Sequence, residues 1–221
     1  MTMFSIFSKK KISINSVAIP DLGWTKGKND QSNIVWVNPE QTIALSVHFF
    51  KVSPDIPTIK NIEILRSFYR QSIVNLNGGL IEVELAQKNK MSFVRTLVKL
   101  PQEPSGMTYI ASLTLPFNTC SFVFKVQAVE VGMTGLREAI IADRLLSTNT
   151  ISIGENGYLN WFSDPYDSSF KGGLLMNKAE QQSYDSEFPN HPLTQARELL
   201  KKIEEGLQWT KELESIPAFN K

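Results

Sequence analysis

The sequence has one cysteine, two histidines and almost no net charge, and each shortage excludes a class of protein. Cys120 has no second cysteine with which to form an intramolecular disulfide, which is typical of a reducing compartment. His48 and His191 lie far apart in the sequence and match no zinc-binding spacing. Lys and Arg number 23 against 22 Asp and Glu, and the resulting net charge of +1 does not favour nucleic acid as a partner.

Long apolar runs are also missing. No stretch approaches the roughly 18 apolar residues of a membrane span, and the lysines at 9–11 follow a short apolar stretch, whereas those of a signal peptide precede one. We therefore expect a cytoplasmic protein without a membrane span. One alternative is an adaptor that touches a membrane surface through residues 1–11, where Phe4, Ile6 and Phe7 lie beside the lysines.

The sequence does contain a regular succession of strand and helix patterns. Apolar residues alternate with period two over 33–37, 42–50, 80–85, 90–100, 107–115 and 120–128, and they recur every three or four residues over 58–76 and 134–146. The order β-β-α-β-β-β-β-α, with links too short for parallel returns, predicts an α+β fold with an antiparallel sheet of about six or seven strands flanked by helices. Residues 12–19 alternate weakly, and 21–32 have the composition of a loop.

Further predictions concern the ends of the helices and the faces of the helices and strands. Thr58 and Thr134 are expected to cap the first two helices, and Gly78-Gly79 to end the first in a left-handed conformation. The second helix is expected to pack back on the sheet. A final helix is expected over 192–213, with Leu193, Ala196, Leu200, Ile203 and Leu207 on one stripe. Ile81, Val83 and Leu85 are expected to share one face of their strand.

These elements predict three parts of the chain. Residues 1–32 form an N-terminal arm and loop, and residues 33–146 form the antiparallel α+β core. Residues 147–221 form an irregular aromatic and acidic segment and then a C-terminal helix, both packed on the core.

For each candidate catalytic group in the sequence, a structural role is better supported than a catalytic one. Cys120 with His48 as its base is one candidate pair, but Cys120 continues the apolar series of Phe122 and Phe124, which favours a buried, unreactive thiol. Glu82 and Glu84 lie roughly 7 Å apart by strand rise, although such pairs usually belong to a solvated strand face. The glycine patterns match no phosphate-binding loop. We therefore predict no catalytic residue, no metal site and no cofactor.

The region 158–193 is the densest feature, with five aromatic residues and two aspartates in its first thirteen positions. It has two interpretations: aspartates that cap turns beside aromatic rings that fix the segment on the sheet, or a recognition surface built as interface hot spots are. The second predicts a binding site at Trp161, Asp164, Tyr166, Asp167, Tyr184, Asp185 and His191. A cation held by Asp164, Asp167, Asp185 and Glu187 is a weaker alternative, since calcium-loop spacing is missing.

The order of elements over about 33–146 resembles the Mog1/PsbP-like fold. The blocks Asp164-Pro-Tyr-Asp167, Tyr184-Asp185, Phe188-Pro189 and His191-Pro192-Leu193 resemble the C-terminal part of an uncharacterised family of bacterial proteins of similar length. The resemblance implies a mostly non-enzymatic family of partner-binding or assembly factors, some of which look like immunity or toxin-system accessory proteins. It carries over no functional residue, because it offers no shared catalytic motif.

Residues and resemblance together predict a non-enzymatic bacterial protein-binding or accessory protein, immunity-like in one version, whose partner is another protein. The alternative is a small-ligand binder or hydrolase with a cleft between the sheet and the C-terminal extension. The sequence leaves the oligomeric state and the functional face of the sheet open.

Overall fold

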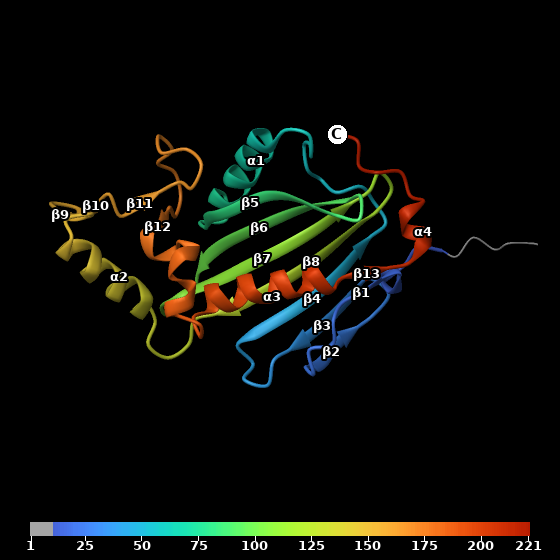
Figure 1. Cartoon of the computed structure of the whole chain (residues 1–221), viewed down its shortest axis with the longest axis horizontal. Coiled ribbons are helices and arrows are strands. Elements are labelled where there is room, and N and C mark those ends of the chain that lie inside the picture. Colours follow the sequence, from blue (N-terminus) through green and yellow to red (C-terminus); the bar gives the residue numbers. More distant parts are fainter. Residues whose placement is uncertain (1–10) are drawn as a thin grey trace, which may run out of the picture.

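A computed structural model describes residues 11–221, and its centre is a seven-stranded antiparallel sheet with the order β2-β3-β4-β8-β7-β6-β5 (Figure 1). The strands are β2 (Thr25–Asn29), β3 (Asn33–Val37), β4 (Ile43–Phe50), β5 (Gly79–Lys88), β6 (Met91–Pro101), β7 (Met107–Pro116) and β8 (Ser121–Val129). The α+β prediction of an antiparallel sheet flanked by helices is therefore confirmed. The predicted membrane contact falls on residues 1–10, outside the described residues, and on Lys11.

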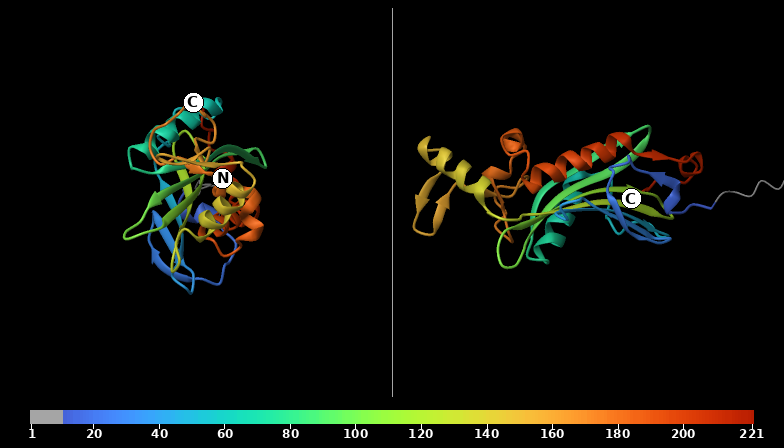
Figure 2. Two further views of the ribbon diagram at one scale, coloured as in Figure 1. Left: turned by 90° about the vertical axis from the view of Figure 1, so that its left-hand side faces the viewer. Right: turned by 90° about the horizontal axis from the view of Figure 1, so that it is seen from below.

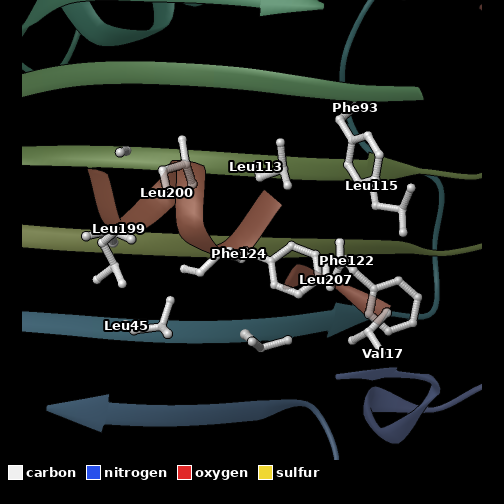
Figure 3. Packing of buried hydrophobic residues seen from close by; sticks show 14 of the residues in the cluster. Val17, Leu45, Phe93, Leu113, Leu115, Phe122, Phe124, Leu199, Leu200 and Leu207 are labelled. Atoms are coloured by element: carbon white, nitrogen blue, oxygen red, sulfur yellow. The ribbon is translucent and has the colours of Figure 1, made fainter. Parts of the chain in front are cut away.

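Helices cover the two faces of this sheet unequally. Helix α1 (Ile62–Val74) joins β4 to β5 and packs with Leu80, Val83 and Val94 near one edge of the sheet. Helix α3 (Pro192–Gly206) crosses the other face, where its leucines meet the inward side chains of β4, β7 and β8 (Figure 3). The predicted α3 stripe is buried: Leu193, Ala196, Leu200, Ile203 and Leu207 are at most 3% exposed.

The period-two patterns of the central strands are confirmed because one face of each strand is buried. In β4, Ile43, Leu45, Val47 and Phe49 point into the core beneath α3. The alternate residues Ser46 and His48 point the other way, and Ser46 pairs across the sheet with Lys125. On that second face Ser46 is buried, whereas His48 and Lys125 are half-buried.

The predicted apolar face of β5 is wrong because the strand contains a bulge. The register with β6 shifts between Leu80 and Glu82, and an extra residue on one strand reverses the alternation beyond it. As a result Ile81 packs in the core under α3, whereas Val83 packs on the opposite face with α1. Leu85 is 38% exposed.

The predicted ends of the first helix need correction. The side chain of Asn61, rather than that of Thr58, caps α1 by accepting the amide hydrogens of Glu63 and Ile64. The left-handed residue after the helix is Asn77, with a φ of 56°, because asparagine tolerates that conformation. Gly79 instead begins β5, and a Cβ there would overlap the carbonyl oxygen of Leu174.

Other boundaries also differ from the predictions. The expected loop over 21–32 contains β2, whereas 12–19 form a short 3-10 turn, η1 (Ile14–Ser16), and β1 (Val17–Ala18), which pairs with β13 (Gln208–Trp209). Helix α3 ends at Gly206, not Leu213, and α4 (Lys211–Glu214) follows. The Nζ of Lys88 donates to the carbonyls of Glu204, Glu205 and Leu207, which satisfies the free end of α3.

Helix α2 (Leu136–Ser147) does not pack back on the sheet as predicted. It lies beyond one end of the sheet and contacts η2 (Lys178–Glu180) (Figure 1, Figure 2). It begins after Gly135, whose φ is 74°, and the Thr134 side chain bonds Ser105 rather than capping it. None of the helices within residues 11–221 has both the length and the apolar character needed to cross a membrane.

Candidate functional site

Residues 131–163, here called the arm, project from the end of the sheet (Figure 1, Figure 2). They comprise the link after β8, helix α2, and three short strands, β9 (Ser152–Gly154), β10 (Gly157–Leu159) and β11 (Phe162–Ser163). A small core holds the arm together and joins it to η2: it consists of Ile141, Ala142, Ile151 and Trp161 of the arm and Ala179 of η2. This core is separate from the two that flank the sheet.

The exposed apolar side chains of the protein gather on the arm. Of the thirteen large hydrophobic residues that are exposed in the described chain, eight lie in the arm. They are Val131, Met133, Leu136, Ile140, Ile153, Tyr158, Leu159 and Phe162. Single exposed apolar residues are normal, but such a concentration marks an interaction surface.

The tip of the arm, residues 152–163, here called the tongue, is a hairpin whose own strands bury almost nothing. Tyr158 pairs opposite Ile153, and the turn uses Gly157 at a φ of 110°, a left-handed conformation that favours glycine. Beyond the hairpin, only Trp161 is buried, at 4% exposure, and its ring meets those of Tyr158 and Phe162. The tongue is therefore held by Trp161 and by the pairing of Phe162 and Ser163 with Asn177 and Met176, and it presents apolar side chains around these contacts.

The free edges of the tongue differ from the free edge of the main sheet. Edge strand β2 carries Lys26 and Lys28, charges that oppose pairing with another strand. The tongue carries one charge, Glu155, and no proline. Strands β9 and β10 form a two-stranded sheet within the described chain. Its edges lack the usual protection against an added strand.

One buried arginine anchors the arm to the rest of the molecule. Arg137, at the start of α2, is 1% exposed. Its guanidinium donates to the carbonyls of Ala179 and Gln181, at 2.7 and 3.0 Å, and to the carboxylate of Asp185 at 2.9 Å. It also donates to the Thr194 hydroxyl at 3.0 Å. Helix α2 is thus fixed to the chain that leads into α3.

The predicted binding residues fall into separate groups. Asp164, Tyr166 and Asp167 lie beside α1 and β5. Tyr184, Asp185 and His191 lie in the segment between the small core of the arm and the start of α3. Trp161 is in the small core of the arm, and Tyr184 packs against that core. Asp185 accepts hydrogen bonds from both Arg137 and Arg197. Internal contacts therefore occupy most of these side chains.

The first group ties the chain to the edge of the sheet. Arg70 of α1 donates through Nε and Nη2 to the two oxygens of Asp164, at 2.7 and 2.8 Å. The hydroxyl of Tyr166 accepts the amide hydrogen of Val83 at 2.7 Å, on the free edge of β5. Asp167 accepts from the amide and the hydroxyl of Ser169.

The Asp164–Arg70 pair makes the free energy of unfolding depend on pH. Burial raises the pKa of Asp164, but the Arg70 guanidinium and two amide hydrogens outweigh it, so the pKa lies below its ordinary value. The carboxylate therefore stabilises the fold fully above the unfolded pKa, near 4, and less as pH falls through the lower, folded pKa. Asp164→Asn should lower the free energy of unfolding by about 2–3 kcal/mol at pH 7 and by less at pH 3, measured by urea unfolding. Asp143→Asn, on the exposed side of α2, is the control, and an equal loss at both pH values would contradict the assignment.

The second group borders a cavity of about 550 Å³ between the end of the sheet, the start of α2 and the start of α3. Val131, Met133, Leu136, Phe188 and Pro189 line its apolar side, and Glu130, Arg137 and His191 its polar side. His191 also caps α3, because its Nδ1 accepts the amide hydrogen of Leu193 at 3.2 Å. This is the predicted type of cleft, between the sheet and the C-terminal part of the chain.

Two carboxylates, those of Glu130 and Glu138, lie close to His191, and Glu130 lines the cavity with it. Glu130 Oε1 lies 3.6 Å from His191 Nε2, beyond hydrogen-bond distance. Burial raises the pKa of Glu130, but the His191 ring and the amides of Gly135 and Met107 lower it by more than burial raises it. The pKa of Glu130 therefore lies below its ordinary value. Burial, reinforced by the charges of Glu130 and Glu180, raises the pKa of Glu138.

A buried ion pair lies between η2 and the sheet. Lys99 Nζ of β6 donates to Glu180 Oε2 at 2.7 Å, and the two side chains are 2% and 0% exposed. The hydroxyl of Tyr109 lies 3.4 Å from the other carboxylate oxygen. Burial, followed by the charge of Glu180, raises the pKa of Tyr109 well above its ordinary value.

The other candidate groups have structural roles. Cys120 is buried in the core under α3, on the opposite face of the sheet from His48, and burial raises the pKa of its thiol. Glu82 pairs with Arg95, and Glu84 pairs with Arg66. Four acidic residues were the candidate ligands of a cation. Asp164, Asp185 and Glu187 each form an ion pair with an arginine, and Asp167 accepts hydrogen bonds from Ser169.

No family model and no curated protein matches the chain. Among solved structures, it is similar to the Ran-binding protein Mog1p of Saccharomyces cerevisiae, with 9% identity, coverage of 88% of this chain and 90% of that one, and a TM-score of 0.46. It is also similar to PsbP of Synechocystis, with 11% identity, coverage of 62% and 81%, and a TM-score of 0.39. A protein of Bacteroides thetaiotaomicron matches at 11% identity and a TM-score of 0.33 over 50% of this chain, which spans 37% of that protein's length. Both names in the predicted Mog1/PsbP-like resemblance thus occur among the structural neighbours, at a similarity that carries no argument about function.

Proposed function

We propose that the protein is a non-enzymatic binding protein and that its tongue contacts a protein partner. The observation that supports this is the exposure of Ile153, Tyr158, Leu159 and Phe162, which are 73%, 42%, 55% and 50% exposed around a single buried anchor, Trp161. Aromatic side chains beside aliphatic ones on a nearly uncharged hairpin are the composition of an interface core.

The partner in this proposal is a different protein with an apolar surface of its own. Glu155 is the only charge in the tongue, so the contact depends on burial of apolar area rather than on charge. The unprotected edges of β9 and β10 also suit an extended segment that adds as a third strand. The proposed site lies next to the residues named from the sequence, and it includes Tyr158 and Phe162 of the aromatic run.

The finer parts of the prediction remain proposals. They are a bacterial cytoplasmic location and an accessory or immunity-like role in a toxin system. The role depends on the identity of the partner, so recovery of a partner unrelated to toxins would contradict the immunity-like version.

The tongue is tested by a photo-crosslinking amino acid at position 159, compared with one at Ile64, which is 51% exposed but on α1. In the native cell, position 159 should capture a protein that position 64 does not. With that partner purified, Tyr158→Ser/Phe162→Ser should raise Kd about 100-fold, which corresponds to about 1.4 kcal/mol from each of two hot-spot side chains.

The control for this experiment is Ile64→Ser/Leu76→Ser, which removes two equally exposed apolar side chains outside the arm. Both double variants should unfold within a few degrees of the parent. Equal Kd values for the two double variants would contradict the proposal. Capture of a second copy of this chain at position 159 would show that the tongue mediates self-association, which would contradict a different protein as the partner.

A small-ligand binder or hydrolase is the second candidate function, and one observation favours it. The cavity of about 550 Å³ places His191 beside Glu130, with an apolar wall that includes Met133. Ligand pockets combine these features. Titration with candidate ligands, followed through the methyl signal of Met133, tests this function, and an unchanged signal would count against it.

A further inference from the structure

Glu130, Glu138 and His191 bring three metal-ligating side chains together from three elements. Glu130 directly follows β8, Glu138 lies in the first turn of α2, and His191 directly precedes α3. One ligand atom from each lies within 4.8 Å of the other two. Their spacing along the sequence matches no metal-binding motif. Only the fold brings them together.

Two side chains of this cluster each have a buried polar atom without a hydrogen-bond partner among the described residues. The side chain of His191 is 9% exposed, and its buried Nε2 has no hydrogen-bond partner among the described residues. The same holds for the buried Oε2 of Glu138. Unpartnered buried polar atoms are rare in folded proteins and call for an occupant. Here both belong to side chains that each bring a ligand atom within 4.8 Å of the Glu130 carboxylate.

We propose that Glu130, Glu138 and His191 form a binding site for a divalent metal ion such as Zn²⁺ or Mn²⁺. Two carboxylates and one imidazole are ligands for metals of this type, whereas Mg²⁺ and Ca²⁺ prefer oxygen alone. Three protein ligands leave at least one coordination position of such an ion free, and two of the three, Glu130 and His191, also line the cavity. The ion would neutralise two carboxylates that otherwise repel each other in a buried place.

The surroundings hold Glu130 in position for this role. The amide of Met107 donates to its Oε2 at 2.8 Å, and the amide of Gly135 donates to its Oε1 at 3.0 Å. Contacts of this kind orient a ligating carboxylate before the metal arrives. Glu138 has no such contact at Oε2, so it is the ligand that the ion would order most.

Metal binding would shift the ring proton of His191. In the structure Nδ1 accepts the amide hydrogen of Leu193, so a neutral ring carries its proton on Nε2. A metal on Nε2 requires that proton to move to Nδ1, and Leu193 then loses its acceptor. Any proton on Glu138 is released to the solvent. The amide of Leu193 therefore reports occupancy of the site without reference to activity.

The test uses the full chain after treatment with a chelator, titrated with Zn²⁺ and with Mn²⁺ by calorimetry. We expect one equivalent to bind, with a shift of the Leu193 amide signal in the NMR spectrum when the ion is the diamagnetic Zn²⁺. Glu138→Gln and His191→Asn should each weaken binding more than about 100-fold, because each removes a direct ligand. Asn is chosen at 191 because it preserves the helix cap.

Two controls separate binding at this site from nonspecific surface binding and from the role of the tongue. Glu187→Gln, at the rim of the same cavity and paired with Arg144, should bind the metal as the parent does. The tongue variant Tyr158→Ser/Phe162→Ser should also bind it normally, so failure of the proposed function and failure of this site are distinguishable. If neither ion binds at one equivalent, the cluster holds only protons, and the proposal would be overturned. Equal weakening in Glu187→Gln, the result of nonspecific surface binding, would also overturn it.

Discussion

Glu180→Gln should lower the free energy of unfolding by about 3–5 kcal/mol, because Lys99 would keep a buried charge without its counter-ion. The two side chains are 0% and 2% exposed, and 2.7 Å separates Lys99 Nζ from Glu180 Oε2. Gln keeps an oxygen for the amide of Asn177, which Glu180 also accepts, so the variant isolates the loss of charge. Urea unfolding at pH 7 measures the difference.

The matched control for this prediction is Glu187→Gln, which removes the partner of Arg144 at 45% and 40% exposure. Exposed pairs contribute about 0–1 kcal/mol, so this variant should be close to the parent. The double variant Lys99→Met/Glu180→Gln should recover much of the loss, since no unpaired charge remains. If the double variant is as unstable as the single one, the unpaired lysine is not the cause.

Burial decides which parts of the fold could be predicted from the sequence. Strands β4, β7 and β8 were predictable because each buries one face, which leaves a period-two pattern in the sequence. The stripe on α3 was predictable for the same reason, with a period near 3.6. Strand β2 was not, because all five of its residues are exposed and it is held only by pairing with β3. Local composition therefore suggested a loop.

The binding residues were harder to assign because their partners lie far away in the sequence. Asp164 pairs with Arg70, 94 residues earlier, and Asp185 pairs with Arg137, 48 residues earlier. Aromatic and acidic residues form the same pattern whether they bind a partner or fix a segment in place. The cluster at His191 left no signal, since Glu130 and Glu138 look like ordinary acidic residues until the fold places them beside the imidazole.

Arg137→Met should release the arm from the rest of the molecule. The change removes four hydrogen bonds and takes from the carbonyl of Ala179 its Arg137 donor, while the carbonyl of Gln181 keeps the amide of Tyr184. The expected loss is about 3–5 kcal/mol. Asp185 keeps Arg197 as a partner, so the damage falls on the arm. Hydrogen exchange should therefore rise about 100-fold or more over residues 136–163, with smaller changes in β6, β7 and β8.

The same variant separates two ways in which the tongue could present its apolar side chains. Arg137→Met leaves Tyr158 and Phe162 unchanged, but it removes the anchor that holds α2. If the partner needs a rigid surface, binding should weaken although every proposed contact residue is present, because ordering the arm would then oppose association. Arg137→Lys, which keeps the charge but not the fork of donors, should fall between Met and the parent. Uniformly faster exchange across the sheet would instead mean that Arg137 supports the whole fold, and binding equal to the parent would mean that the tongue acts without its anchor.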